Sequence, residues 1–416
     1  MMLDRVWGLW WALSQLKRVA RSGDFMQMTI QSSVKALLLT TCVVVLCATG
    51  DAVLAQETPS EAEIDPDLAD NGPIGRLSAR LAYNSDTGGV AALGFSTNRL
   101  MGQDQTLEFN LRAEEDGTSA SFRYNNDALF GSSPQFGLNL LHAQKDAGDI
   151  YDFNSRVTRL EPRLTWQLSP QSRFTAYGIL ADTDISNVPA TTSALIRADE
   201  GRVKTTGIGG KYEHQFRPAP GGSLKRARVR FGLEYATSDA DNDHIKLTTS
   251  AQSIHVLAQG RVVLRSQLRL GTLHSQSGTS SIGDRYMLGQ ASIRGFEFGG
   301  FGPRDLAVDG DPALGGNSYG VAKIDVQFPG AFGEAGRRVT PGLFVDVGSL
   351  WNLDDVAGGI AGADPVDDSA RMRASIGVSL SIKTGIGPLK IHAAHPIASE
   401  DYDRTQTLGL ELNATF

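Results

Sequence analysis

The chain has 416 residues and a formal net charge of −7; 20% of its residues are charged and 41% are hydrophobic. The low charged fraction argues against a highly charged disordered chain, and the negative charge argues against a nucleic-acid partner. The 46 glycines, about 11% against a usual ~7%, favour turns and strands over long helices, and the scarcity of long apolar runs excludes a polytopic helical membrane protein.

Residues 28–55 have the pattern of a secretory signal peptide. Lys35 supplies a positive charge before an apolar run that extends to Cys47, and Val53-Leu54-Ala55 offers small residues where a signal peptidase cleaves. The pattern predicts export, with Gln56 as the first residue of the mature chain. The alternative is an uncleaved anchor helix.

The segments on either side of this signal are expected to lie outside any folded domain. Residues 1–27 are interpreted as an extension from a misassigned start site, because Met26 or Met28 is a better start for the signal; an amphipathic helix on a membrane surface is the alternative. Residues 56–75 are acidic, contain three prolines and are expected to form a flexible periplasmic tail. Both cysteines, Cys42 and Cys47, fall inside the signal, so a mature chain would have no disulfide and no thiol chemistry.

The body of the chain, residues 76–416, has a hydrophobic period of two. Apolar and polar residues alternate in the segments 107–112, 160–168, 228–235 and 372–383, among others. Such alternation gives each strand one apolar and one polar face. A soluble antiparallel sandwich would alternate as well, but segments of about ten residues are the length that a tilted membrane strand needs. With the predicted export, the pattern favours an all-β transmembrane barrel.

We count sixteen such segments, an even number as bacterial barrels require. The expected strands begin near residues 76, 88, 104, 118, 136, 158, 172, 201, 227, 245, 261, 315, 338, 372, 387 and 406. The last ends at Phe416, a terminal aromatic residue on the apolar face. The fold expected from the sequence is therefore a 16-stranded antiparallel transmembrane β-barrel with one long connection, between strands 11 and 12.

That long connection contains three short motifs. They are Ile293-Arg294-Gly295-Phe296, Gly302-Pro303-Arg304-Asp305 and Gly315-Gly316-Asn317. Over residues 284–416 the chain resembles the BamA/TamA superfamily of outer-membrane assembly and secretion barrels, also called the bacterial surface antigen family, and the first two motifs resemble the signature of that family's sixth extracellular loop. The resemblance implies that the long loop folds back inside the barrel.

The resemblance also implies that Arg294 pairs with carboxylates on the lumen wall, at the matching positions Asp346 and Asp325. Periodicity agrees, because both aspartates lie on the polar face of their strands and should point inward. A guanidinium is a planar fork that fits a carboxylate, which suits an arginine that fixes a loop to a wall. Gly295 would permit a tight turn and Phe296 would anchor beside it. The alternative is an ordinary solvated loop arginine.

The function that the resemblance implies is assistance in the insertion or translocation of proteins at the outer membrane, through a weakly paired lateral seam between the strands near 76 and 406. The implied partners are outer-membrane lipids and unfolded outer-membrane or secreted client proteins. Relatives that fold or secrete proteins carry periplasmic POTRA domains, for which residues 56–75 are too short, so a separate periplasmic partner is a further hypothesis. The alternative function is a passive pore or structural barrel.

The sequence shows no catalytic constellation, and we expect no enzyme activity, no cofactor and no metal site. None of the seven histidines has the spacing of a metal-ligand pair on a helix. The glycine-rich stretches 207–210 and 299–302 do not lead from a strand into a helix, so no phosphate loop is indicated. Asp243-His244, in a predicted loop, is the one pair that could belong to a hydrolase at the barrel rim.

Overall fold

The computed structural model describes residues 75–84, 88–98, 105–131, 133–148, 152–333, 338–385 and 387–415. The predicted start-site extension, the signal peptide, all but the last residue of the acidic tail and the terminal Phe416 lie outside the described residues. Within the described ranges no helix has both the length and the apolar character to cross a bilayer.

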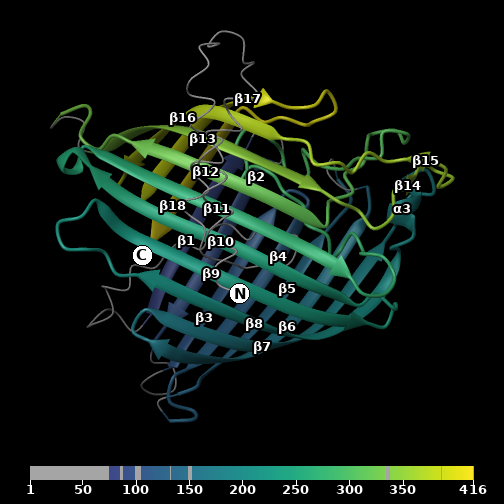
Figure 1. Ribbon diagram of the computed structural model, residues 1–416, viewed down its shortest axis with the longest axis horizontal. Coiled ribbons are helices and arrows are strands. Elements are labelled where there is room, and N and C mark those ends of the chain that lie inside the picture. Colours follow the sequence, from purple (N-terminus) through teal and green to yellow (C-terminus); the bar gives the residue numbers. More distant parts are fainter. Residues whose placement is uncertain are drawn as a thin grey trace, which may run out of the picture. The chain divides into compact units, whose positions relative to one another are not determined.

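Sixteen antiparallel strands close into a barrel in chain order, which confirms the expected fold (Figure 1). The strands are β1 (Gly75–Asn84), β2 (Gly88–Thr97), β3 (Gln105–Glu114), β4 (Gly117–Asn126), β5 (Gln135–Lys145), β6 (Asn154–Ser169), β7 (Ser172–Ser186), β8 (Gly201–Phe216), β9 (Leu224–Ser238), β10 (His244–Leu257), β11 (Val262–Ser275), β12 (Ser318–Gln327), β13 (Val339–Trp351), β16 (Arg373–Lys383), β17 (Pro388–Ala398) and β18 (Leu408–Thr415). Each expected start lies within four residues of the observed one. In the closed barrel each strand pairs with a neighbour on both sides. The hydrocarbon core of a membrane requires this, because it offers no hydrogen-bond partners to backbone groups.

Three short elements were not expected. They are helix α3 (Ala194–Arg197), the 3₁₀ turn η2 (Ala258–Gly260) and a two-stranded sheet of β14 (Ala357–Gly358) and β15 (Asp364–Pro365). Elements of two to four residues are too short to produce a readable period, so alternation could not have predicted them.

The two faces of the wall differ as the alternation predicts. Outward side chains such as Leu81, Ile208 and Leu233 are more than half exposed, at 57%, 68% and 53%. Inward polar side chains such as Arg159 and Glu234 are instead buried and joined by an ion pair of 3.1 Å. Exposed leucine and isoleucine rows around a closed barrel are stable only against lipid.

The three longest connections, residues 187–200, 276–317 and 352–372, lie at the same end of the barrel, because each follows a strand that runs in the same direction. Long loops of this kind are extracellular in outer-membrane barrels. Apolar side chains of these connections and of neighbouring strand ends pack into one cluster: Phe153, Ile185, Leu195, Ile196, Ile282, Leu314, Leu353 and Val366. The long loops therefore hold one another over this end of the barrel.

A charge on the lipid-facing wall tests this orientation. We expect Ile208→Arg, halfway along β8 on the outer face, to lower the free energy of unfolding in phospholipid vesicles by ~2–4 kcal/mol. Gln144→Arg, at the extracellular end of β5 on the outer face, should lower the free energy of unfolding by only about 0–1 kcal/mol. Denaturant titration followed by tryptophan fluorescence measures both. Equal losses would contradict the assigned membrane depth.

Candidate functional site

The candidate site is the ion cluster that Arg294 forms with Asp346 and Asp325, which we call the latch. Arg294 Nε donates to Asp346 Oδ2 at 2.7 Å, and Nη2 donates to Oδ1 of the same carboxylate at 2.6 Å. Nη1 donates to Asp325 Oδ1 at 2.7 Å, and the backbone N–H of Arg294 donates to Asp346 Oδ2 at 3.0 Å. The structure thus brings together the three residues that the sequence singled out.

The latch is buried and its charges are balanced. The side chain of Asp346 is fully buried and that of Arg294 is 13% exposed. Lys323 Nζ lies 3.8 Å from Asp346 Oδ2 and donates to the carbonyl oxygen of Ala291 at 2.6 Å. Two cations therefore face two carboxylates, and removal of either partner would leave an uncompensated buried charge, which costs about 3–5 kcal/mol in such pairs.

The register of β12 and β13 explains how the two carboxylates converge. Lys323 pairs with Asp346 and Asp325 pairs with Phe344 across the two strands, so the aspartates are diagonal neighbours on the inward face. The Phe344 ring lies 3.6 Å from the centre of the Arg294 guanidinium, a cation–π contact. The sequence analysis missed Phe344 and Lys323, although their inward parity could have signalled both.

The residues beside Arg294 fit the loop closely to the wall. Gly295 has φ +97°, and a Cβ there would lie 3.2 Å from Ala394 Cβ of β17 and 3.4 Å from Ser375 Cβ of β16. Ile293 and Phe296 are fully buried, and Phe296 packs edge-to-face on Phe301 at 5.3 Å. A side chain at position 295 would therefore be strained and crowded at once.

The remaining motif residues stabilise the loop itself rather than the latch. In the second motif, Gly302 packs on Leu350, the carbonyl oxygen of Pro303 accepts a hydrogen bond from Leu314 N–H, and Arg304 donates to the carbonyl oxygens of Gly299 and Asp311. The carboxylate of Asp305 accepts a hydrogen bond from Gly359 N–H. In the third motif, Gly315 has φ +70°, Gly316 pairs with Tyr286, and Asn317 N–H donates to the carbonyl oxygen of Asn352. Burial, together with the nearby charge of Arg404, lowers the pKa of Arg304 to about 10. These contacts fold the loop and tie it to the connection between β13 and β16.

The loop also contacts the segment that leads into β18, which the sequence did not predict. Gln406 N–H donates to the carbonyl oxygen of Gly295 at 2.9 Å, Glu297 N–H to that of Arg404 at 3.1 Å, and Arg404 N–H to that of Gly300 at 2.8 Å. Gln290 and His392 of β17 form a side-chain hydrogen bond of 2.8 Å. The loop that carries Arg294 therefore lies against β12, β13, β16 and β17 and reaches the start of β18.

β18 itself has few partners. Among the described residues it pairs with β1 over seven positions, as many as β2 with β3, and with β17 over five, whereas β7 and β8 pair over fourteen. The weakly paired seam between β1 and β18 that the sequence analysis expected stays a prediction; the registered pairing is shorter between β17 and β18 than between β1 and β18. β18 has eight residues and β17 begins with Pro388, which cannot donate to the ladder.

The hydrolase alternative at Asp243-His244 has poor geometry. His244 is 1% exposed, and its ring lies 3.9 Å from the carboxylate of loop residue Asp284. A substrate at the rim has no access to that ring. In the part of the chain that the structure describes, three or more potential metal ligands are nowhere grouped together.

Comparison with known proteins places this geometry in a family. A model of the Omp85 superfamily domain matches residues 76–416. The outer membrane protein assembly factor BamA of Neorickettsia risticii (strain Illinois) is 23% identical over 352 residues, and that of Neisseria meningitidis serogroup B is 29% identical over 143 residues. These matches cover 83% and 31% of this chain but 45% and 18% of the relatives, so the chain spans less than half the length of either.

Solved structures show the same fold. BamA from Haemophilus ducreyi lacking POTRA domains 1–3 matches with a TM-score of 0.67 and 18% identity, covering 83% of this chain and 71% of that one. CdiB from Acinetobacter baumannii matches with a TM-score of 0.55 and 13% identity, over 83% of this chain and 60% of that one. At such low identities the likeness concerns the fold alone.

A double-mutant cycle tests the latch. We expect Arg294→Ala and Asp346→Asn each to lower the free energy of unfolding by ~3–5 kcal/mol, because each leaves buried charge unpaired. The double variant should lose less than the sum, by about 1–3 kcal/mol. The exposed pair Arg371 and Asp367 is the control, and truncation of either should cost ~0–1 kcal/mol. Additive losses at the latch would mean that its side chains do not interact.

Asp199 predicts a pH dependence in the long loop. It accepts a hydrogen bond from Ile282 N–H at 2.7 Å, and burial raises the pKa of its carboxyl to about 6 although Arg285 opposes the rise. Since the folded chain favours the neutral acid, this stabilisation is complete below about pH 4 and is lost as the pH rises through about 6, by up to ~3 kcal/mol.

Amide hydrogen exchange of residues 280–286 measures this loss. Between pH 5 and pH 8, exchange should accelerate beyond the intrinsic rate increase in the unmodified protein and should not do so in Asp199→Asn. The same pH dependence in both proteins would exclude Asp199 as its source.

Proposed function

The chain belongs to the Omp85 superfamily and forms a barrel of the bacterial outer membrane, and from this premise we propose that it assists the insertion or translocation of client proteins there. The single observation that supports this proposal best is the pairing of β18 with β17 over five residues, fewer than between any other neighbouring barrel strands in the described ranges. The clients would be unfolded outer-membrane or secreted proteins, and a separate periplasmic chain would be a further partner.

Strand length supports the proposed lateral seam. A β-strand rises about 3.3 Å per residue, so the eight residues of β18 span roughly 26 Å against about 53 Å for the sixteen of β6. Short strands form few backbone hydrogen bonds with their neighbours. Separation of β18 from β1 would expose a row of N–H and C=O groups that can pair with an incoming strand.

The latch loop would control this seam. Its backbone bonds to Arg404 and Gln406 fix the chain directly before β18, while Arg294 fixes the loop to β12 and β13. Movement of the loop would therefore alter the position of the first residues of β18. In this proposal the latch keeps the barrel closed in the absence of a client.

A passive pore is the second candidate function, since arginines and carboxylates line the lumen. Against it stands the packing of the long loops, whose apolar clusters fill space at the extracellular end and beneath it. A pore of this kind would conduct ions without any effect on the folding of another protein.

A disulfide across the seam separates the two functions. Ala82 of β1 and Glu411 of β18 are directly opposite one another and share the inward parity, so Ala82→Cys with Glu411→Cys should form a disulfide. In vesicles, we expect the oxidised double variant to lose the ability to accelerate folding of an unfolded barrel client, and reduction should restore it.

Gln252→Cys with Gln267→Cys is the matched control, an inward pair directly opposite one another on β10 and β11. Its oxidation should leave the acceleration unchanged. Acceleration that persists with the seam locked would contradict lateral opening, and ion conductance without any acceleration would favour the passive pore.

A further inference from the structure

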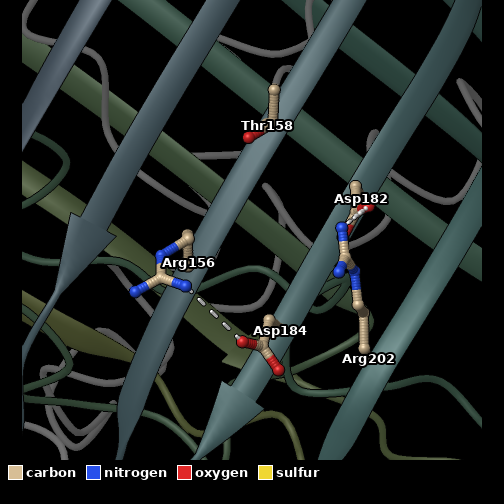
Figure 2. Close-up of a pocket in the computed structure, with 5 residues that line it drawn as sticks. All are labelled: Arg156, Thr158, Asp182, Asp184 and Arg202. Carbon is tan, nitrogen blue, oxygen red and sulfur yellow. Dashed lines mark hydrogen bonds and ion pairs between the residues drawn. The ribbon is translucent and has the colours of Figure 1, made fainter.

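The outer wall carries a charged pocket at the extracellular ends of β6, β7 and β8. Arg156, Thr158, Asp182, Asp184 and Arg202 line it, and it encloses about 270 Å³. Figure 2 shows the two arginines on either side of the two aspartates of β7. The pocket contributes neither to the latch nor to the seam.

The pocket faces the membrane side of the wall and not the lumen. Asp182 and Asp184 share the parity of Leu180, which is 52% exposed, and Arg202 shares the parity of Ile208, which is 68% exposed. The lumen network uses the opposite parity of β6, in Arg159 and Glu161. The charged rows therefore continue the lipid-facing surface toward the extracellular end.

The depth of the pocket matches the edge of the hydrocarbon layer. At the other end of the same face, Trp166 and Phe174 pack with ring centroids 6.0 Å apart, in the position of an interfacial aromatic girdle. From Trp166 to Arg156 the strand rises about 33 Å, or roughly 25 Å along the membrane normal at a tilt of about 40°. This equals the height of a barrel's apolar band, which is about 25 Å, so Arg156 lies at headgroup level.

The charges of the pocket are arranged in two rows. Arg156, Asp184 and Arg202 face one another across the three strands, as do Thr158, Asp182 and Lys204. Asp239, which follows β9, lies beside Lys204 and accepts a hydrogen bond from its backbone N–H at 2.8 Å. Three cations thus face three carboxylates. Arg202 binds Asp182 with both Nε and Nη2, at 2.8 and 2.6 Å, whereas Arg156 and Asp184 are 3.9 Å apart.

This arrangement leaves cationic groups open to the headgroup layer. The side chains of Arg156 and Arg202 are 55% and 65% exposed. They stand on strands two apart, about 9.6 Å from each other at the backbone, with Asp184 of β7 between them. A phosphate that contacts both guanidinium groups would therefore lie on the membrane side of that carboxylate. Arginine suits this ligand because its planar fork matches phosphate oxygens.

We propose that this pocket binds the phosphate of an anionic lipid headgroup in the outer leaflet. Arg156 and Arg202 donate to the phosphate oxygens, and Lys204 adds positive charge beside them. Asp182 orients the guanidinium of Arg202, and Asp184 limits affinity by repulsion. A bound lipid at this position would fix the depth of the long-strand side of the barrel.

Titration of phosphatidylglycerol into the purified full-length chain in neutral detergent micelles, followed by native mass spectrometry, tests the proposal. We expect Arg156→Gln with Arg202→Gln to raise the apparent Kd of the tightest lipid about tenfold for each arginine lost, because each guanidinium donates charge-assisted hydrogen bonds to the phosphate. Asp184→Asn should lower that Kd. Arg371→Gln, which removes an exposed arginine from a loop at the same end, should leave it unchanged.

Three results would overturn the proposal: equal affinity in the double variant and the Arg371→Gln control, equal binding of phosphatidylcholine, or displacement of the lipid by millimolar inorganic phosphate alone. The last would indicate a site for free phosphate and not for a lipid. Heat-modifiable electrophoretic mobility verifies that each variant retains a closed barrel, so a loss of binding is not a loss of fold. The test involves no client, so its outcome is independent of the seam.

Discussion

The pairing of Arg294 with Asp346 is the constraint on which the position of the long loop depends. Asp346 is fully buried in the inner wall and takes three hydrogen bonds from Arg294, two from the guanidinium and one from the backbone. The buried carboxylate of Asp346 needs a nearby cation, and the guanidinium of Arg294 needs the carboxylates, because burial of an unpaired charge costs free energy. The loop therefore cannot leave the wall without admission of water or of another cation to Asp346.

The same loop connects distant parts of the barrel. Arg294 engages β12 and β13, Gly295 lies against β16 and β17, and the backbone at 295–300 bonds to residues 404–406 ahead of β18. These strands are successive neighbours in the closed barrel. The loop thus braces the stretch of wall that ends at β18, where registered pairing is shortest. Three backbone hydrogen bonds from the loop hold the segment that leads into the short strand.

The hydrophobic period of two was sufficient to predict the barrel strands and the inward direction of the latch carboxylates. Such a period shows both which segments are strands and which face of the sheet each side chain occupies. It placed every strand start within four residues, and it gave Asp325 and Asp346 inward parity. The pairing of Arg294 came from resemblance to a motif. The apolar cluster under the loops, α3, and the bonds at 404–406 have no local period. They depend on how a long loop folds against residues about a hundred positions away, which no window of sequence contains.

Strand length and backbone pairing differ around the circumference of the barrel. β6 to β10 are long, pair over many residues and carry the lumen network of Arg159 and Glu234, so backbone pairing is most extensive on this side of the wall. Their extra length lifts charged rows above the apolar band, where a lipid headgroup can contact them. The opposite side ends in an eight-residue strand. In the two proposals, a lipid bound to the long strands fixes the depth of that side in the membrane, so that changes at β18 need not disturb its position. The proposed lateral opening would then move β18 while the long-strand side stays in place.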